Sequence, residues 1–133
     1  MEQKNRIEIL TPDFRHSMIF SLTTLGIEPP DVFNHNIETV PRLYPLVRPA
    51  ADYQSSLNLL KTHKELYLRI PTKSGLMLGL GETYDEIYAI LNDLRTNNVD
   101  KITIGQYLQP SKDHLKVQRF VTPLEFSKFA KLA

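Results

Sequence analysis

The sequence contains no cysteine among its 133 residues. A disulfide is therefore impossible, and the chain itself offers no thiolate to an iron–sulfur cluster or to a cysteine-type zinc site. The net charge is only +1 and the basic residues form no cluster, which argues against a dedicated nucleic-acid surface. No apolar run reaches the length of a membrane span.

The N-terminus also lacks a targeting signal. Residues Met1 to Arg6 are polar and contain no apolar segment of the kind found in secretory signals, so a cytoplasmic protein is expected. The length permits at most one domain, and an apolar content of 41% is enough for a packed core. We expect residues 1–133 to form one core domain, or a piece of a larger one.

The segment from Pro71 to Thr83 has the clearest local pattern in the chain. Its apolar run, Leu76-Met77-Leu78, is typical of a strand buried on both faces, as strands are in parallel sheets. Thr83 and Glu86 then form a Thr-x-x-Glu capping box in front of apolar residues at helical spacing. The order strand, turn, helix places the intervening turn where α/β folds bind ligands.

The intervening turn contains two glycines. Gly79 and Gly81 carry no Cβ, so a planar base could approach the backbone there, although the same residues could simply make a tight turn. A dinucleotide fingerprint is excluded, because Tyr84 occupies the place of the third glycine in G-x-G-x-x-G. Glu82 is expected to brace the turn rather than to contact a ligand.

Short apolar runs alternate with helical periodicity along the rest of the chain. The β-α order, repeated four times, predicts an α/β fold with parallel strands and right-handed crossovers. Four units do not close a barrel, so we expect an arc, a partial (βα) barrel with open edge strands. The expected strands lie at Ile7–Leu10, Asp31–Asn34, Leu76–Leu78 and Ile102–Tyr107, and the helices at 18–25, 41–47, 52–70, 83–97 and from 122 onward.

Polar residues gather where the expected strands end. Asn36 and Glu38 follow the second strand, while Gln106 and Tyr107 end the fourth, and parallel strands end on the same side of a sheet. An amide and a carboxylate suit ribose hydroxyls, because both hydroxyls can donate to a carboxylate. The backbone from Gly105 to Tyr107 could hydrogen-bond a planar base. No nucleophile–base pair is present, so the pattern indicates binding and supplies no catalytic residue and no metal ligand set.

Several of these residues also have a purely structural interpretation. His35 stands between two asparagines with no second ligand at metal-binding spacing, so we expect it to orient the turn. The role of Glu38 could be limited to stabilising a helix start through the helix dipole. Lys73 could be a solvated charge at a strand start, and Arg48, before Pro49, a surface residue.

Five segments form a dense, collinear set: Pro12-Asp13-Phe14-Arg15, Asp31–Arg42, Val47–Tyr53, Pro71–Glu82 and Gly105–Ser111. Together they resemble lipoyl synthase, a family of the radical S-adenosylmethionine enzymes. The resemblance runs from about Ile7 to the last helix and is far more specific than a single motif. It implies units three to six of a partial (βα)6 barrel.

The resemblance also implies a reaction. Lipoyl synthases insert two sulfur atoms, at C6 and C8, into an octanoyl chain linked to a lysine of a lipoyl carrier domain. One 4Fe-4S cluster cleaves S-adenosylmethionine to a 5′-deoxyadenosyl radical, and a second, auxiliary cluster supplies the sulfur. The implied cofactors are S-adenosylmethionine and both clusters, and the implied partner is the octanoylated lipoyl carrier domain.

The resemblance further implies roles for individual residues. Residues 75–82 are similar to the family's G-x-I-x-G-x-x-E element beside the adenine, with Met77 at the Ile position. Asn36 and Glu38 match the strand exit that holds the ribose. The remaining implied contacts are the strand backbone at Gln106 and Tyr107 for the adenine, and Arg48 and Lys73 for the cofactor carboxylate or the substrate.

The departures from the family are equally informative. Its members carry two three-cysteine motifs before the region matched here and an Arg-Ser-Ser-Tyr motif after it, and this chain has none of these. We therefore expect a core domain truncated at both ends, unable to hold a cluster and inactive alone. The rival hypothesis is a non-catalytic remnant or split-gene subunit that binds a nucleoside-like ligand or a partner chain, such as the missing N-terminal barrel half. An unrelated phosphate-binding enzyme is not favoured, because no Gly-Lys-Ser/Thr sequence follows the glycines.

Overall fold

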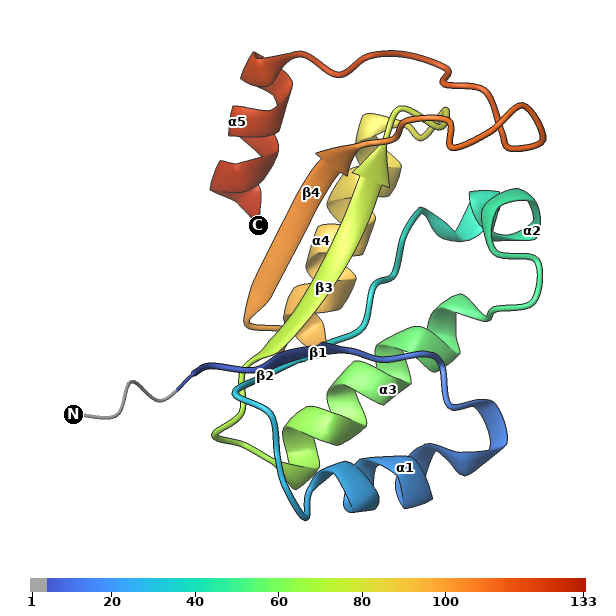
Figure 1. Ribbon diagram of the computed structural model, residues 1–133. Coiled ribbons are helices and arrows are strands. Elements are labelled where there is room, and N and C mark those ends of the chain that lie inside the picture. Colours follow the sequence, from blue (N-terminus) through green and yellow to red (C-terminus); the bar gives the residue numbers. More distant parts are fainter. Residues whose placement is uncertain (1–4) are drawn as a thin grey trace.

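A computed structural model describes residues 5–133, which build one parallel sheet with helices packed along one of its faces (Figure 1). The predicted α/β class is confirmed, since four parallel strands lie side by side in the order in which they occur in the sequence. This is the arrangement of a partial barrel. The strands are β1 (Glu8–Leu10), β2 (Val32–Asn34), β3 (Thr72–Leu78) and β4 (Lys101–Gln106).

The helices begin close to the positions that the sequence predicted. Asp52 caps α3 by accepting a hydrogen bond from the Ser55 amide at 2.7 Å, and capping boxes begin both α4 and α5. Two 3₁₀ turns, Arg15–Ser17 and Pro41–Leu43, lead into the first two helices. The helices are α1 (Met18–Leu25), α2 (Tyr44–Val47), α3 (Tyr53–Leu66), α4 (Tyr84–Thr96) and α5 (Pro123–Leu132).

The prediction that the central strand is buried on both faces is wrong. Burial alternates strictly along β3: the side chains at 72, 74, 76 and 78 are buried, whereas Lys73, Gly75 and Met77 are only half-buried. Figure 1 shows α4 behind β3 and β4, and no helix of the described residues lies over the opposite face. The strand begins at Thr72, so the apolar run Leu76-Met77-Leu78 is only its last part. Lys73 and Gly75, earlier in the strand, lie on the uncovered face.

His63 of α3 lies in the core between the sheet and the helices. Its ring stacks on Phe33 of β2 with centroids 3.8 Å apart and planes 10° from parallel, and it is 1% exposed. Its Nδ1 atom has no hydrogen-bond partner among residues 5–133. Burial, with a smaller contribution from the Lys64 charge, lowers the pKa of His63 from 6.5 to about 4.

This burial predicts a loss of stability in mild acid. Between pH 6.5 and about pH 4 the unfolded chain binds a proton at His63 that the folded chain does not bind. The contribution of neutral His63 to the free energy of unfolding should therefore be complete above pH 6.5. The free energy should fall by up to about 3 kcal/mol as the pH drops to about 4. Urea unfolding at several pH values should show a much flatter profile for His63→Leu, whereas the exposed-site control His16→Gln should keep the parent profile. An unchanged profile in His63→Leu would contradict this assignment.

Candidate functional site

The uncovered face of the sheet carries an open groove of about 260 Å³. Asn36 and Glu38, which follow β2, form one wall, and Lys73 and Gly75 of β3 line its centre. Gly105 lies on the β4 side. The groove therefore brings together residues from three strand segments, including the amide and the carboxylate that the sequence predicted for ribose binding.

The backbone at Glu38 extends the sheet beyond the end of β2. Its N–H donates to the Gly75 carbonyl at 2.9 Å, and its carbonyl accepts from the Met77 amide at 2.8 Å. Glu38 is in the left-handed region, with φ at 68°, which a residue with a side chain seldom adopts. The Glu38 side chain is half-buried at the groove.

Two glycines line this groove, Gly75 and Gly105, and they differ in what lies beside them. A Cβ on Gly75 would lie 2.6 Å from Oδ1 of Asn36, so the Asn36 amide rests directly against the β3 backbone. A Cβ on Gly105 would meet nothing within 4 Å, so this position leaves open space beside β4. The sequence predicted a role for the backbone at Gly105 but did not pair it with Gly75, although the spacing of Lys73, Gly75 and Met77 marks a single strand face.

The space at Gly79 is filled by the chain itself and not by a cavity. Its φ is 103°, and an added Cβ would collide with the Gln106 side-chain amide and lie 2.5 Å from the Arg119 carbonyl. The Gln118 amide donates to the Gly79 carbonyl at 2.8 Å. Gly81 also has a positive φ, and its nearest neighbour is the Gln118 side chain. Here the glycines make a turn on which the connection between β4 and α5 packs, as the plain-turn interpretation predicted.

Glu82 braces that turn, as expected. Its buried carboxylate accepts hydrogen bonds from the Gly79 amide at 2.6 Å and from the Leu80 amide at 2.9 Å. Both donors are backbone groups that the turn removes from the sheet pairing. The carboxylate therefore satisfies two buried donors and leaves little capacity for a ligand.

Removal of this carboxylate should destabilise the chain strongly. Glu82→Ala leaves the Gly79 and Leu80 amides buried without an acceptor, so a loss of about 2–4 kcal/mol in the free energy of unfolding is expected. Glu82→Gln retains one acceptor oxygen and should lose less. The control Glu65→Ala removes a carboxylate on the exposed side of α3 and should be close to neutral. Equal urea midpoints for Glu82→Ala and Glu65→Ala would contradict the bracing role.

Gln106 and Tyr107 face the β4–α5 connection and not the groove. The Gln106 side-chain oxygen accepts from the Val121 amide at 2.8 Å, and its nitrogen donates to the Arg119 carbonyl at 3.1 Å. Tyr107 is buried, and its hydroxyl donates to the Leu115 carbonyl at 2.8 Å. The contact of this strand with the groove is made through Thr103 and Gly105 instead.

Lys73 lies in the groove, but its charge already has a partner. Its ammonium group is 2.9 Å from a carboxylate oxygen of Glu8 on β1, and the same carboxylate accepts from the Asn34 side chain at 3.0 Å. The hydrogen bond from Lys73 and then that from Asn34 lower the pKa of Glu8. A ligand carboxylate would have to compete with Glu8 for Lys73.

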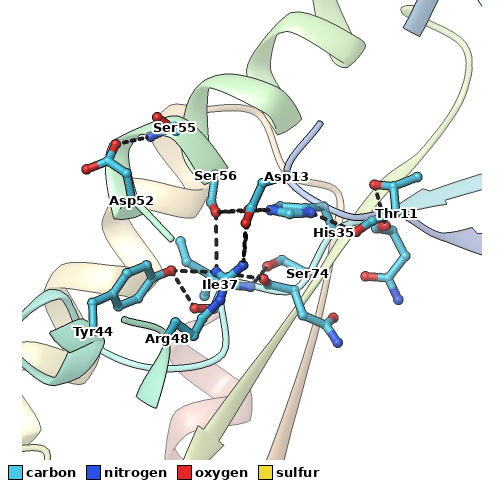
Figure 2. A network of polar contacts seen from close by, with 12 residues as sticks. Thr11, Asp13, His35, Ile37, Tyr44, Arg48, Asp52, Ser55, Ser56 and Ser74 are labelled. Carbon is cyan, nitrogen blue, oxygen red and sulfur yellow. Dashed lines mark hydrogen bonds and ion pairs between the residues drawn. The ribbon is translucent and has the colours of Figure 1, made fainter. Parts of the chain in front are cut away.

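Arg48 belongs to a polar network behind the groove (Figure 2). Its guanidinium contacts both carboxylate oxygens of Asp13, at 3.0 and 3.2 Å, and is largely buried. Asp13 also accepts from the Ser56 hydroxyl at 3.1 Å. His35 donates from Nδ1 to the Thr11 carbonyl at 2.9 Å and lies 3.1 Å from Asp13 through Nε2, while burial lowers its pKa. The network ties the ends of β1 and β2 to α3, which is the structural role expected for His35.

Within residues 5–133, no group of three or more His, Cys, Asp or Glu side chains could hold a metal ion. None of the helices in the same range is both long and apolar enough to cross a membrane.

The fold defines a class: an arc of parallel βα units with helices on one face and a polar groove on the other, as in part of a (βα) barrel. No family model matches the chain. It is nevertheless similar to lipoyl synthases over almost its whole length, which confirms the resemblance predicted from the sequence. It is 60% identical to the lipoyl synthase of Baumannia cicadellinicola over 123 residues, which is 92% of this chain and 42% of that protein.

Other lipoyl synthases match to the same extent. The identity is 58% to the protein of Haemophilus influenzae strain Rd, over 93% of this chain and 39% of the relative. It is also 58% to the protein of Shewanella sediminis, over 96% of this chain and 40% of the relative. The chain thus spans about two fifths of the length of the curated relatives it matches.

Proposed function

We propose that this chain forms the nucleoside-binding part of a lipoyl synthase, and that its groove holds the adenosyl portion of S-adenosylmethionine. One observation carries the proposal: Glu38 and Asn36 line an open groove whose opposite side, at Gly105, has no heavy atom within 4 Å of where a Cβ would lie. The carboxylate can accept hydrogen bonds from both ribose hydroxyls, and the open backbone at Gly105 can receive a flat base. The other residues predicted for the site would stabilise the turn after β3 and the adjoining β4–α5 connection: Gly79, Gly81, Glu82, Gln106 and Tyr107.

The reaction of the whole enzyme is part of this proposal. S-adenosylmethionine would supply the radical that allows sulfur insertion at C6 and C8 of an octanoyl group on a lipoyl carrier domain. This chain contains no cysteine, so its residues do not fit either 4Fe-4S cluster, and no step at a cluster is attributed to it. Its own contribution is to bind and orient the ribose and the base.

The domain organisation follows from the same reasoning. Residues 1–133 correspond to units three to six of a barrel, so the uncovered face of the sheet would line the barrel interior. The backbone edge of β4 is not paired with another strand within residues 5–133. A split-gene subunit would present the same groove and edge to an N-terminal half. A coding segment upstream that contains both three-cysteine motifs would identify a fragment.

A comparison of two nucleosides tests the binding proposal. Calorimetric titration of the chain with adenosine should show binding at one site, and 2′,3′-dideoxyadenosine should bind at least tenfold more weakly, because it lacks both donors for Glu38. The two ligands present the same base. Equal affinities, or no binding of adenosine, would contradict the proposal.

A further inference from the structure

The left-handed backbone at Glu38 requires something to hold it. A side chain disfavours φ near 68°, and such residues persist only where their surroundings fix the conformation. The planar peptide between Ile37 and Glu38 decides this angle, because φ of Glu38 describes rotation about the bond that leaves that plane. The Glu38 carbonyl is held by the Met77 amide at 2.8 Å, so whatever fixes the plane of the preceding peptide limits φ of Glu38 and with it the direction of the Cα–Cβ bond.

Both polar ends of that peptide are held. The Glu38 amide donates to the Gly75 carbonyl of β3 at 2.9 Å. On the other side, the Ile37 carbonyl accepts a hydrogen bond from the Tyr44 hydroxyl at 2.6 Å. Tyr44 is 5% exposed, and burial raises the pKa of its phenol, so the hydroxyl stays protonated and remains a donor at neutral pH. The peptide is thus fixed between β3 and α2.

Tyr44 is itself held by the network described above. Arg48, four residues further on, donates to the Tyr44 hydroxyl at 3.0 Å, and its guanidinium lies 5.3 Å from the centre of the Tyr44 ring. The same nitrogen lies 3.4 Å from the Asn36 carbonyl, one residue before Ile37. Figure 2 shows Tyr44 and Arg48 converging near Ile37, with Asp13 above the Arg48 guanidinium in this view. A continuous set of polar contacts therefore runs from Asp13 to the peptide of Glu38.

We infer that Tyr44, supported by Arg48, is a positioning residue that directs the Glu38 carboxylate into the groove. Tyr44 does not line the groove, so it acts through the Ile37–Glu38 peptide and touches no ligand. The effect on a ligand rests on the proposed nucleoside site, whereas the effect on the Glu38 backbone does not. This separation allows the two ideas to be tested apart.

The first test uses amide hydrogen exchange and needs no ligand. Tyr44→Phe removes only the hydroxyl, and should speed exchange about five- to tenfold at the Glu38 and Met77 amides, which join this segment to β3. The Tyr107 amide, which bonds the Leu78 carbonyl at 2.8 Å, reports on the other side of β3 and should change little.

Tyr53→Phe is the matched control for this test. The Tyr53 hydroxyl is also partly buried, but it donates to Asp93 at 2.7 Å and not to the Ile37 carbonyl, which accepts from Tyr44. Tyr53→Phe should therefore produce no selective change in hydrogen exchange at the Glu38 and Met77 amides. Unchanged exchange at these two amides in Tyr44→Phe, or equal acceleration at Tyr107, would overturn the inference.

The second test is a double-mutant cycle on adenosine affinity. Tyr44→Phe should weaken binding about five- to tenfold when Glu38 is present, and should have no further effect in the Glu38→Ala background. Additive losses would overturn the positioning role. If the parent chain does not bind adenosine, the proposed function fails, and the exchange test alone decides whether Tyr44 positions Glu38.

Discussion

Gly79→Ala is expected to lower the free energy of unfolding by at least about 3 kcal/mol. Two effects add at this position. The backbone has a φ of 103°, which a residue with a Cβ strongly disfavours, and the new methyl group would lie 2.5 Å from the Arg119 carbonyl. The obstacle on that side is backbone, so the strain can be relieved only by moving the β4–α5 connection. Urea unfolding with circular dichroism measures the loss directly.

Gly105→Ala provides the matched control for that experiment. Its Cβ would enter open space, so its unfolding free energy should stay within about 1 kcal/mol of the parent value. The same methyl group would project into the groove, so this variant should bind adenosine more weakly while remaining folded. The assignment of Gly79 to structure and Gly105 to the groove would be wrong if Gly79→Ala were as stable as Gly105→Ala.

Glu38→Ala should weaken adenosine binding roughly ten- to a hundredfold. The substitution removes a charged acceptor from one or two hydrogen bonds with neutral hydroxyls, and each such bond contributes about 1.5–3 kcal/mol. Glu38→Gln keeps the shape and loses the charge, so an intermediate affinity is expected. Calorimetric titration at pH 7 gives both values on the same scale.

His35→Ala distinguishes a ligand contact from a structural contact nearby. His35 is 1% exposed and bonds to Thr11 and Ser56, so its loss should lower stability. The affinity of the folded fraction for adenosine should remain close to the parent value. The same loss of affinity in His35→Ala and Glu38→Ala, measured on folded protein, would contradict a purely structural role for His35.

The architecture could be predicted because it depends on short-range patterns. Thr83 with Glu86, and Thr122 with Glu125, are capping boxes three residues apart, and both cap helices as expected. The alternation of strands and helices then leaves parallel pairing as the natural arrangement. Asn36 and Glu38 could be placed at the end of β2 for the same reason, since they follow a strand of known direction, and both line the groove.

The rest depended on contacts between residues far apart in the sequence. Gly79 and Gly105 are both glycines after or within apolar strands, and only the packing of Arg119 against one of them shows which has room for a ligand. The sequence predicted a helix over residues 41–47 but gave Tyr44 no role, because its bond to the Ile37 carbonyl depends on how α2 folds back on the β2 exit. The one-sided burial of β3 was missed because the prediction rested on Leu76, Met77 and Leu78, which are all apolar, whereas the alternation becomes visible only with Lys73 and Gly75 included.

The central claim is that the uncovered face of the sheet at Glu38 and Gly105 is a nucleoside site, and amide chemical-shift mapping tests it most directly. A ¹⁵N-labelled sample titrated with adenosine should show its largest saturable shifts at Glu38, Gly75 and Gly105, with Glu38→Ala abolishing them at the same ligand concentration. Shifts concentrated instead at Gly79, Gly81 and Gln118, or unaffected by Glu38→Ala, would contradict the account.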